Sequence, residues 1–94
     1  MKVRWNRQAL RRLEEIHSHI GGDALNRATL FCERIIAAAE QLESHPFSGP
    51  LLPEDGAYRQ LVVEGYRLVY RIADDGIYVM TIVGPGMLVE GIIR

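Results

Sequence analysis

The 94-residue sequence has little cysteine, little lysine and no long apolar run, and each shortage excludes a class of protein. Cys32 is the only cysteine, so the chain cannot form an internal disulfide or a metal site built from several thiolates. Lys2 is the only lysine, and the 11 Lys and Arg residues are balanced by 12 Asp and Glu, for a net charge of −1. This balance argues against a general nucleic-acid coat, whose affinity depends on many cations that neutralise phosphates.

The sequence also lacks the signals of a membrane or secreted protein. Its longest uncharged stretch, residues 77–89, is interrupted by Gly84-Pro85-Gly86 and is too short to cross a bilayer. No apolar segment follows the charged residues at the start, so we expect no secretory signal, no membrane partner and a cytoplasmic location. Apolar residues make up 48% of the chain and charged residues 24%, which predicts one folded domain over residues 1–94.

The first half of the chain has the spacing of two helices after a short strand at residues 2–5. Asn6 is a suitable N-cap for the first helix, and Gly21-Gly22 is expected to end it. Asp23 can cap a second helix that ends near His45, where a proline-containing loop begins. The short glycine link predicts an antiparallel helical hairpin. The apolar stripe of the first helix holds Ala9, Leu13, Ile16 and Ile20.

The second half of the chain changes to a period of two, which predicts strands at residues 58–63, 66–72 and 77–83 after a loop that runs to about Gly56. Glu64-Gly65 and Asp75-Gly76 are expected to form the two hairpin turns. Residues 87–93 are a candidate further edge strand. The predicted fold class is therefore α+β, in the order β-α-α-β-β-β(-β), with an antiparallel sheet covered on one face by the helical hairpin.

Two-residue turns would fix the strand registers. The first turn places Arg59 opposite Tyr70 and Val62 opposite Arg67, and the second places Arg67 opposite Gly84. In this register Val83 faces the helices and Ile82 faces away from them. Arg67, Arg71 and Tyr58 then share the face away from the helices, and together with Arg59 they form the predicted binding site. A pair of solvated arginines without a function fits the pattern equally well.

The sequence offers few groups for acid–base chemistry beside these arginines. Tyr58 is the only candidate on the same face in the predicted register. His17 and His19 are two residues apart on a helix, so they point to different sides and cannot bind one metal together. No nucleophile-elbow, phosphate-loop or zinc-protease motif occurs. We therefore expect no metal and no cofactor.

The segment Gly65-Tyr66-Arg67-Leu68-Val69-Tyr70, within the strand pair from Arg59 to Arg71, resembles the RelE/ParE superfamily of bacterial toxins from type II toxin–antitoxin modules. Trp5 followed by residues 9–16, and the segment His45-Pro46-Phe47-Ser48-Gly49-Pro50, are similar to the ParE branch. The similarity extends over residues 2–84. It implies the fold predicted above and a small toxin that is neutralised by a cognate antitoxin, ParD-like or similar.

The resemblance leaves three functions open. ParE-type members inhibit DNA gyrase by binding, and RelE-type members cut messenger RNA in the ribosome without a metal. Arg67 matches the sheet arginine of the RelE type, with Arg71 or Arg59 in support, and would be catalytic only in that interpretation. The RelE-type loop lysines, the basic segment after the last strand and the terminal aromatic residue have no counterpart here. Gyrase inhibition is therefore the preferred function, and a non-toxic antitoxin-binding protein is the third alternative.

The end of the sequence is apolar, which predicts a contact surface. Such a tail is prone to aggregation unless it is paired or covered. We expect it to contact the antitoxin, a second copy of the chain or its own sheet edge, in a homodimer or a toxin–antitoxin hetero-oligomer. An acidic antitoxin segment is expected to cross Arg67 and Arg71. The tail residues concerned are Leu88, Val89, Ile92 and Ile93.

Overall fold

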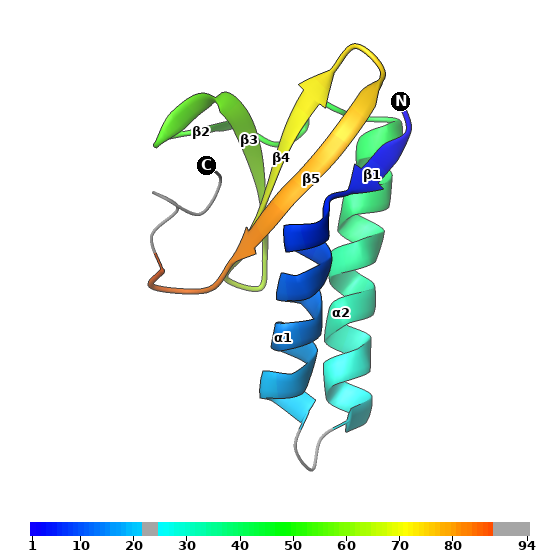
Figure 1. Cartoon of the computed structure of the whole chain (residues 1–94), viewed down its shortest axis with the longest axis vertical. Helices are drawn as coiled ribbons and strands as arrows, with labels where there is room; N and C mark the ends of the chain where they lie inside the picture. Colours follow the sequence, from blue (N-terminus) through cyan, green and yellow to red (C-terminus); the bar gives the residue numbers. More distant parts are fainter. Residues whose placement is uncertain (22–24, 88–94) are drawn as a thin grey trace.

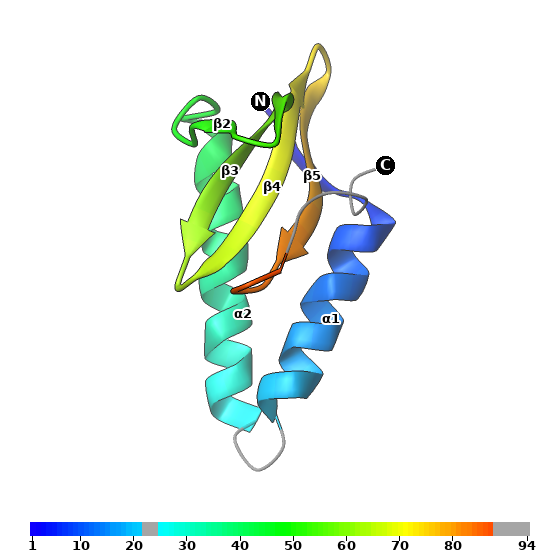
Figure 2. The same ribbon diagram turned by 90° about the vertical axis from the view of Figure 1, so that its left-hand side faces the viewer.

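Two helices and five strands make up the part of the chain that the computed structural model describes, residues 1–21 and 25–87 (Figure 1). Their bounds are β1 Val3–Trp5, α1 Arg7–Gly21, α2 Leu25–Glu40, β2 Leu51–Leu52, β3 Asp55–Val63, β4 Tyr66–Ala73 and β5 Gly76–Val83, with a 3-10 turn at Gln41–Glu43 after α2. The helices pack side by side and cover one face of the sheet (Figure 2). The predicted α+β fold class is confirmed.

The five strands form one sheet in the order β1-β5-β4-β3-β2. The neighbours β2–β3, β3–β4 and β4–β5 are antiparallel, whereas β1 runs parallel to β5, with Val3 opposite Ile77. The sheet is therefore mixed, not antiparallel throughout as the sequence suggested. β1 lies at the edge of the sheet beside β5, the last strand, and the chain passes from β1 into α1.

Asn6 links β1 to α1 as predicted. Its side-chain Oδ1 accepts a hydrogen bond from the backbone N–H of Ala9 at 2.8 Å, which satisfies one of the free donors of the first helical turn. Its own backbone N–H donates to the carbonyl of Val79 on β5 at 3.0 Å. The helix therefore starts at a fixed point on the sheet. The predicted cap Asp23 lies outside the described residues.

The main core lies between the helices and the sheet. Small residues of the helices allow close approach, and larger side chains of α2 fill the space above the central strands. The ring of Phe31 on α2 lies 5.1 Å from that of Tyr66 on β4, in a tilted arrangement. The buried members of this core are Ala9, Ile16, Phe31, Ile35, Ala39, Leu68, Val79 and Ile82.

The first predicted hairpin is confirmed, and the second is shifted by one residue. Glu64 and Gly65 both have positive φ, at 50° and 88°, as a two-residue turn of this kind requires. The second turn is formed by Asp74-Asp75, since Ala73 pairs with Gly76. Gly76 is instead a strand residue at which β1 passes very close, because a Cβ there would lie 2.8 Å from the carbonyl oxygen of Lys2.

A β-bulge changes the register along β4 and β5. Tyr70 pairs with Val79 but Val69 pairs with Thr81, so Met80 is the extra residue. Arg67 consequently lies opposite Val83, and its predicted pairing with Gly84 is wrong. The bulge also exchanges the predicted sides of two residues. Ile82 packs toward the helices, while Val83 packs on the other face of the sheet.

The predicted loop between α2 and the sheet contains a strand. β2 pairs with β3 through Leu51–Arg59 and Leu52–Asp55, and β3 already begins at Asp55. Leu52 is only 2% exposed and packs with Val69 and Val83 on the sheet face opposite the helices. This face is therefore partly covered, which the expectation of a loop up to Gly56 did not include.

Candidate functional site

The sheet face opposite the helices, here called the outer face, brings together three of the predicted site residues. Arg67, Val69 and Arg71 alternate with helix-facing residues along β4, so they point the same way. Tyr58 of β3 packs against the small cluster formed by Leu52, Val69 and Val83 on this face. Arg67, Arg71 and Tyr58 thus share the outer face, as the alternation of the sequence predicts.

Arg67 is held by an acidic partner. Its Nη2 donates to Oε2 of Glu54 at 2.8 Å and its Nη1 to Oε1 at 3.2 Å, a bidentate pair, and Nη1 also donates to Oε1 of Gln60 at 3.1 Å. The hydrogen bond from Arg67 is the main reason that the pKa of Glu54 is lowered. The charge of Arg67 is therefore already neutralised, and an anionic partner has to displace Glu54 in order to reach it.

Arg71 lies in a different environment at the other end of the outer face. It stands opposite Tyr78 of β5, which in turn stands opposite Arg4 of β1, so the three residues form a row across three strands. The guanidinium carbons of Arg71 and Arg4 lie 4.9 and 5.9 Å from the centre of the Tyr78 ring. Among the described residues Arg71 forms no ion pair within 4.0 Å.

Asp75 closes this row at the β4–β5 turn. Its Oδ2 accepts a hydrogen bond of 2.7 Å from the hydroxyl of Tyr78 and lies 3.6 Å from Nη1 of Arg4. The Tyr78 hydrogen bond, with smaller contributions from the two arginines, lowers the pKa of Asp75. Arg4 is therefore partly neutralised, and Arg71 is the outer-face arginine most available to a partner.

Arg59 does not join the other three residues. It pairs with Tyr70, whose side chain packs toward Leu42 on the helix-facing side of the sheet. Its Nη1 donates to the carbonyl oxygen of Gly49 at 2.8 Å, and its guanidinium lies 5.0 Å from the centre of the Phe47 ring. Arg59 therefore holds the chain segment before β2 in place. The predicted four-residue site is divided between the two faces of the sheet.

The predicted tail contacts fall outside the structure's described range. Leu88, Val89, Ile92 and Ile93 all belong to residues 88–94, whereas the described chain ends at Met87. Their proposed contacts with an antitoxin or a second copy remain predictions.

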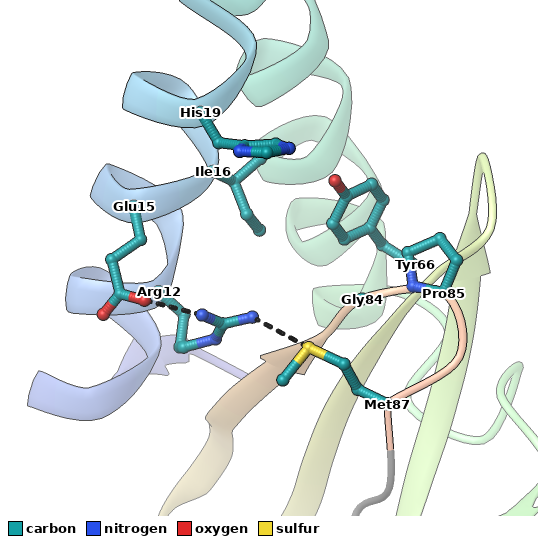
Figure 3. A pocket seen from close by; sticks show the side chains of 8 residues that line it. All are labelled: Arg12, Glu15, Ile16, His19, Tyr66, Gly84, Pro85 and Met87. Atoms are coloured by element: carbon teal, nitrogen blue, oxygen red, sulfur yellow. Dashed lines mark hydrogen bonds and ion pairs between the residues drawn. The ribbon is translucent and has the colours of Figure 1, made fainter.

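A pocket that the sequence did not indicate lies between α1 and the end of β5 and has a volume of about 440 Å³ (Figure 3). One wall is a single stripe of α1 at spacings of three, four and seven residues, which brings an arginine, a glutamate and a histidine together. The spacing of these three residues is visible in the sequence. The tyrosine of the opposite wall is far from them along the chain, so the sequence alone does not indicate the pocket. The polar residues that line the pocket are Arg12, Glu15, His19 and Tyr66.

The described residues show no site for a metal ion or a reactive thiol. They contain no group of three or more His, Cys, Asp or Glu side chains that could hold a metal. Cys32 is buried in α2, where its Sγ lies 3.9 Å from the carbonyl oxygen of Leu13, and burial raises the pKa of its thiol. None of the described helices is long and apolar enough to cross a membrane.

One comparison with known proteins identifies the family, and another finds solved structures with the same fold. A family model described as the ParE toxin of the type II toxin–antitoxin system parDE matches residues 3–86. A structure of the chromosomal ParDE toxin–antitoxin system from P. aeruginosa superimposes with a TM-score of 0.79 at 21% identity, covering 90% of this chain and 96% of that one. The RelBE2 toxin–antitoxin complex from Mycobacterium tuberculosis gives a TM-score of 0.65 at 20% identity, covering 88% and 95%. No curated protein sequence matches the chain.

Proposed function

The chain belongs to the ParE toxin family of type II toxin–antitoxin systems, and from this membership we propose that it inhibits DNA gyrase by binding and is neutralised by a cognate antitoxin. The observation that carries the proposal is the family match over residues 3–86, which spans every described helix and strand. Such an inhibitor acts in the cytoplasm, where its target and its antitoxin are located.

The contacts of the arginines support inhibition by binding over cleavage of RNA. A phosphate clamp needs a guanidinium that is free to meet the charge developing on phosphate. Arg67, the residue that would be catalytic in the RelE-like interpretation, is occupied by Glu54 and Gln60, and Arg59 is directed to Gly49 on the other side of the sheet. Of the three arginines, only Arg71 is without an ion pair among the described residues. Residues 84–87 after β5 contribute no cation. These features weigh against a RelE-like ribosome-dependent endonuclease.

The expected partner is an antitoxin of the ParD type or one similar to it. The two solved structures named above come from toxin–antitoxin systems, which supports a hetero-oligomeric state for this chain as well. We infer that an acidic antitoxin segment crosses the outer face, where Arg71 is available and Arg67 can exchange Glu54 for a carboxylate of the partner.

A supercoiling assay tests the proposal directly. Purified protein is added in excess to DNA gyrase and relaxed plasmid, with and without the antitoxin encoded beside its gene. We expect supercoiling to be inhibited or cleaved DNA to be trapped on gyrase, and the antitoxin to reverse the effect. Unimpaired supercoiling at excess protein contradicts the proposal.

Two further measurements separate the alternatives. Primer extension on translated messages after induction reveals codon-register cuts if the protein is an endonuclease, and cuts of that kind would replace our proposal. Normal growth after induction without the antitoxin would instead identify a non-toxic antitoxin-binding protein.

A further inference from the structure

Arg12 lines the pocket, and two of its three guanidinium nitrogens already have oxygen acceptors. Its Nε donates to the carbonyl oxygen of Ile82 at 3.1 Å and its Nη1 to Oε2 of Glu15 at 2.6 Å. Among the described residues its Nη2 meets only the thioether sulfur of Met87 at 3.7 Å, which is a weak acceptor. The guanidinium is thus held in place by two strong bonds, and an oxygen acceptor could replace the sulfur without moving it.

Two further polar groups of the pocket lack partners. Neither the imidazole of His19 nor the hydroxyl of Tyr66 forms a hydrogen bond within the part of the chain that the structure describes. The Tyr66 hydroxyl points across the pocket toward His19, while the Arg12 guanidinium lies below them (Figure 3). Together with Nη2 of Arg12 they offer three donors around one space, because the neutral imidazole carries one N–H.

The charge of the pocket suits a carboxylate better than a phosphate. Glu15 offsets the charge of Arg12 through their 2.6 Å ion pair, so the pocket has too little positive charge for a doubly charged phosphate. A carboxylate carries a single charge on two oxygens, and three donors can satisfy it.

The remaining walls indicate that the carboxylate belongs to a polypeptide. Ile16, Pro85 and Met87 give the pocket an apolar lining, and Met87 is 46% exposed. The volume of about 440 Å³ is larger than a lone carboxylate fills and suits an acidic side chain with apolar neighbours.

We propose that this pocket binds an acidic side chain, flanked by apolar residues, of a partner polypeptide. The carboxylate replaces the Met87 sulfur on Nη2 of Arg12 and accepts hydrogen bonds from Tyr66 and His19, while the flanking residues cover Ile16 and Pro85. Identifying that partner as the antitoxin rests on the proposed function, whereas the recognition of the acidic peptide does not.

The test uses the full chain and two blocked tripeptides, one with glutamate between two leucines and one with glutamine in its place. Titrations are followed by the NMR signals of the Tyr66 and His19 rings. We expect saturable shifts with the glutamate peptide and about tenfold weaker binding of the glutamine peptide, since a charge-assisted hydrogen bond is lost. Equal binding of the two peptides overturns the proposal.

Variants and a small-molecule probe sharpen the result. Arg12→Gln is expected to abolish the preference for glutamate, and Arg11→Gln, which removes the same charge one residue outside the pocket, to retain it. If Arg12→Gln fails to fold, Tyr66→Phe carries the test, because it removes only the hydroxyl and keeps the ring against Phe31. Three results contradict the proposal. The first is an equal loss of the preference for the glutamate peptide in Arg11→Gln, and the second is an unchanged preference in Tyr66→Phe. The third is that acetate binds as tightly as the glutamate peptide.

The peptide titration contains neither gyrase nor antitoxin. A discriminating pocket in a protein that leaves gyrase unaffected would contradict only the proposed function. A protein that inhibits gyrase but does not distinguish the two peptides would contradict only the pocket assignment.

Discussion

Tyr70 fixes a chain segment that has no regular secondary structure. Its buried hydroxyl donates to the carbonyl oxygen of Pro46 at 2.8 Å and accepts the backbone N–H of Gly49 at 3.1 Å. Burial raises the pKa of this phenol. A side chain at Gly49 has no room, since a Cβ would lie 2.7 Å from the Tyr70 oxygen. The sheet thus positions the segment that leads into β2.

Tyr70→Phe is expected to destabilise the protein by about 1–3 kcal/mol, because it leaves the buried N–H of Gly49 and the partly buried carbonyl of Pro46 without their partner. The measurement is urea unfolding followed by circular dichroism. Tyr58→Phe is the matched control, since Tyr58 is only partly buried and forms no hydrogen bond with the described residues. An equal effect of the two substitutions would show that the Tyr70 hydroxyl bonds contribute nothing specific.

The availability of individual arginines could not be read from the sequence. Alternation along β4 placed Arg67 and Arg71 on one face, which is where they lie. Whether each charge is free depends on Glu54 in the turn after β2 and on Tyr78 across the sheet. Both contacts join residues from different parts of the fold, so no local sequence pattern predicts them.

Local turn chemistry predicted the β3–β4 hairpin but could not predict the β4–β5 hairpin. The Glu64-Gly65 turn satisfies its own backbone requirements, and the pairs that follow from it are all observed. Asp75-Gly76 matches one of the strongest turn patterns, but Gly76 is needed for the approach of β1, and Met80 bulges out of β5. A contact from the opposite end of the chain therefore decides the register here.

Gly76→Ala is expected to weaken the attachment of β1 to β5. Gly76 has φ of 152° and the new methyl group would collide with the Lys2 carbonyl, which accepts the 2.8 Å hydrogen bond of the Ile77 N–H. A loss of stability of about 1–3 kcal/mol is expected, with faster hydrogen exchange at the Ile77 amide. Gly56→Ala is the control, because a methyl group added at Gly56 would have no atom within 4 Å. Unchanged exchange at Ile77 would contradict this role of Gly76.

At the scale of the whole molecule, the chain presents two surfaces with different chemistry. The outer face carries Arg71 and the neutralised Arg67, and it was predictable because strand alternation is a short-range pattern. The pocket combines one stripe of α1 with Tyr66 and the segment after β5, so it exists only once helix and sheet are packed together. A partner that wraps around the domain can reach both.

Charge reversal on the outer face tests whether the antitoxin crosses it. Arg71→Glu and Arg67→Glu are each expected to weaken antitoxin binding about tenfold at low salt, with a smaller effect at high salt, because an acidic segment then meets a like charge. Arg67→Glu also places its carboxylate beside Glu54, so its thermal unfolding is compared with that of the native chain. Arg11→Glu reverses the same charge on α1, outside the outer face, and should leave the affinity unchanged. Calorimetric titrations in which all three variants bind like the native chain would place the antitoxin contact elsewhere.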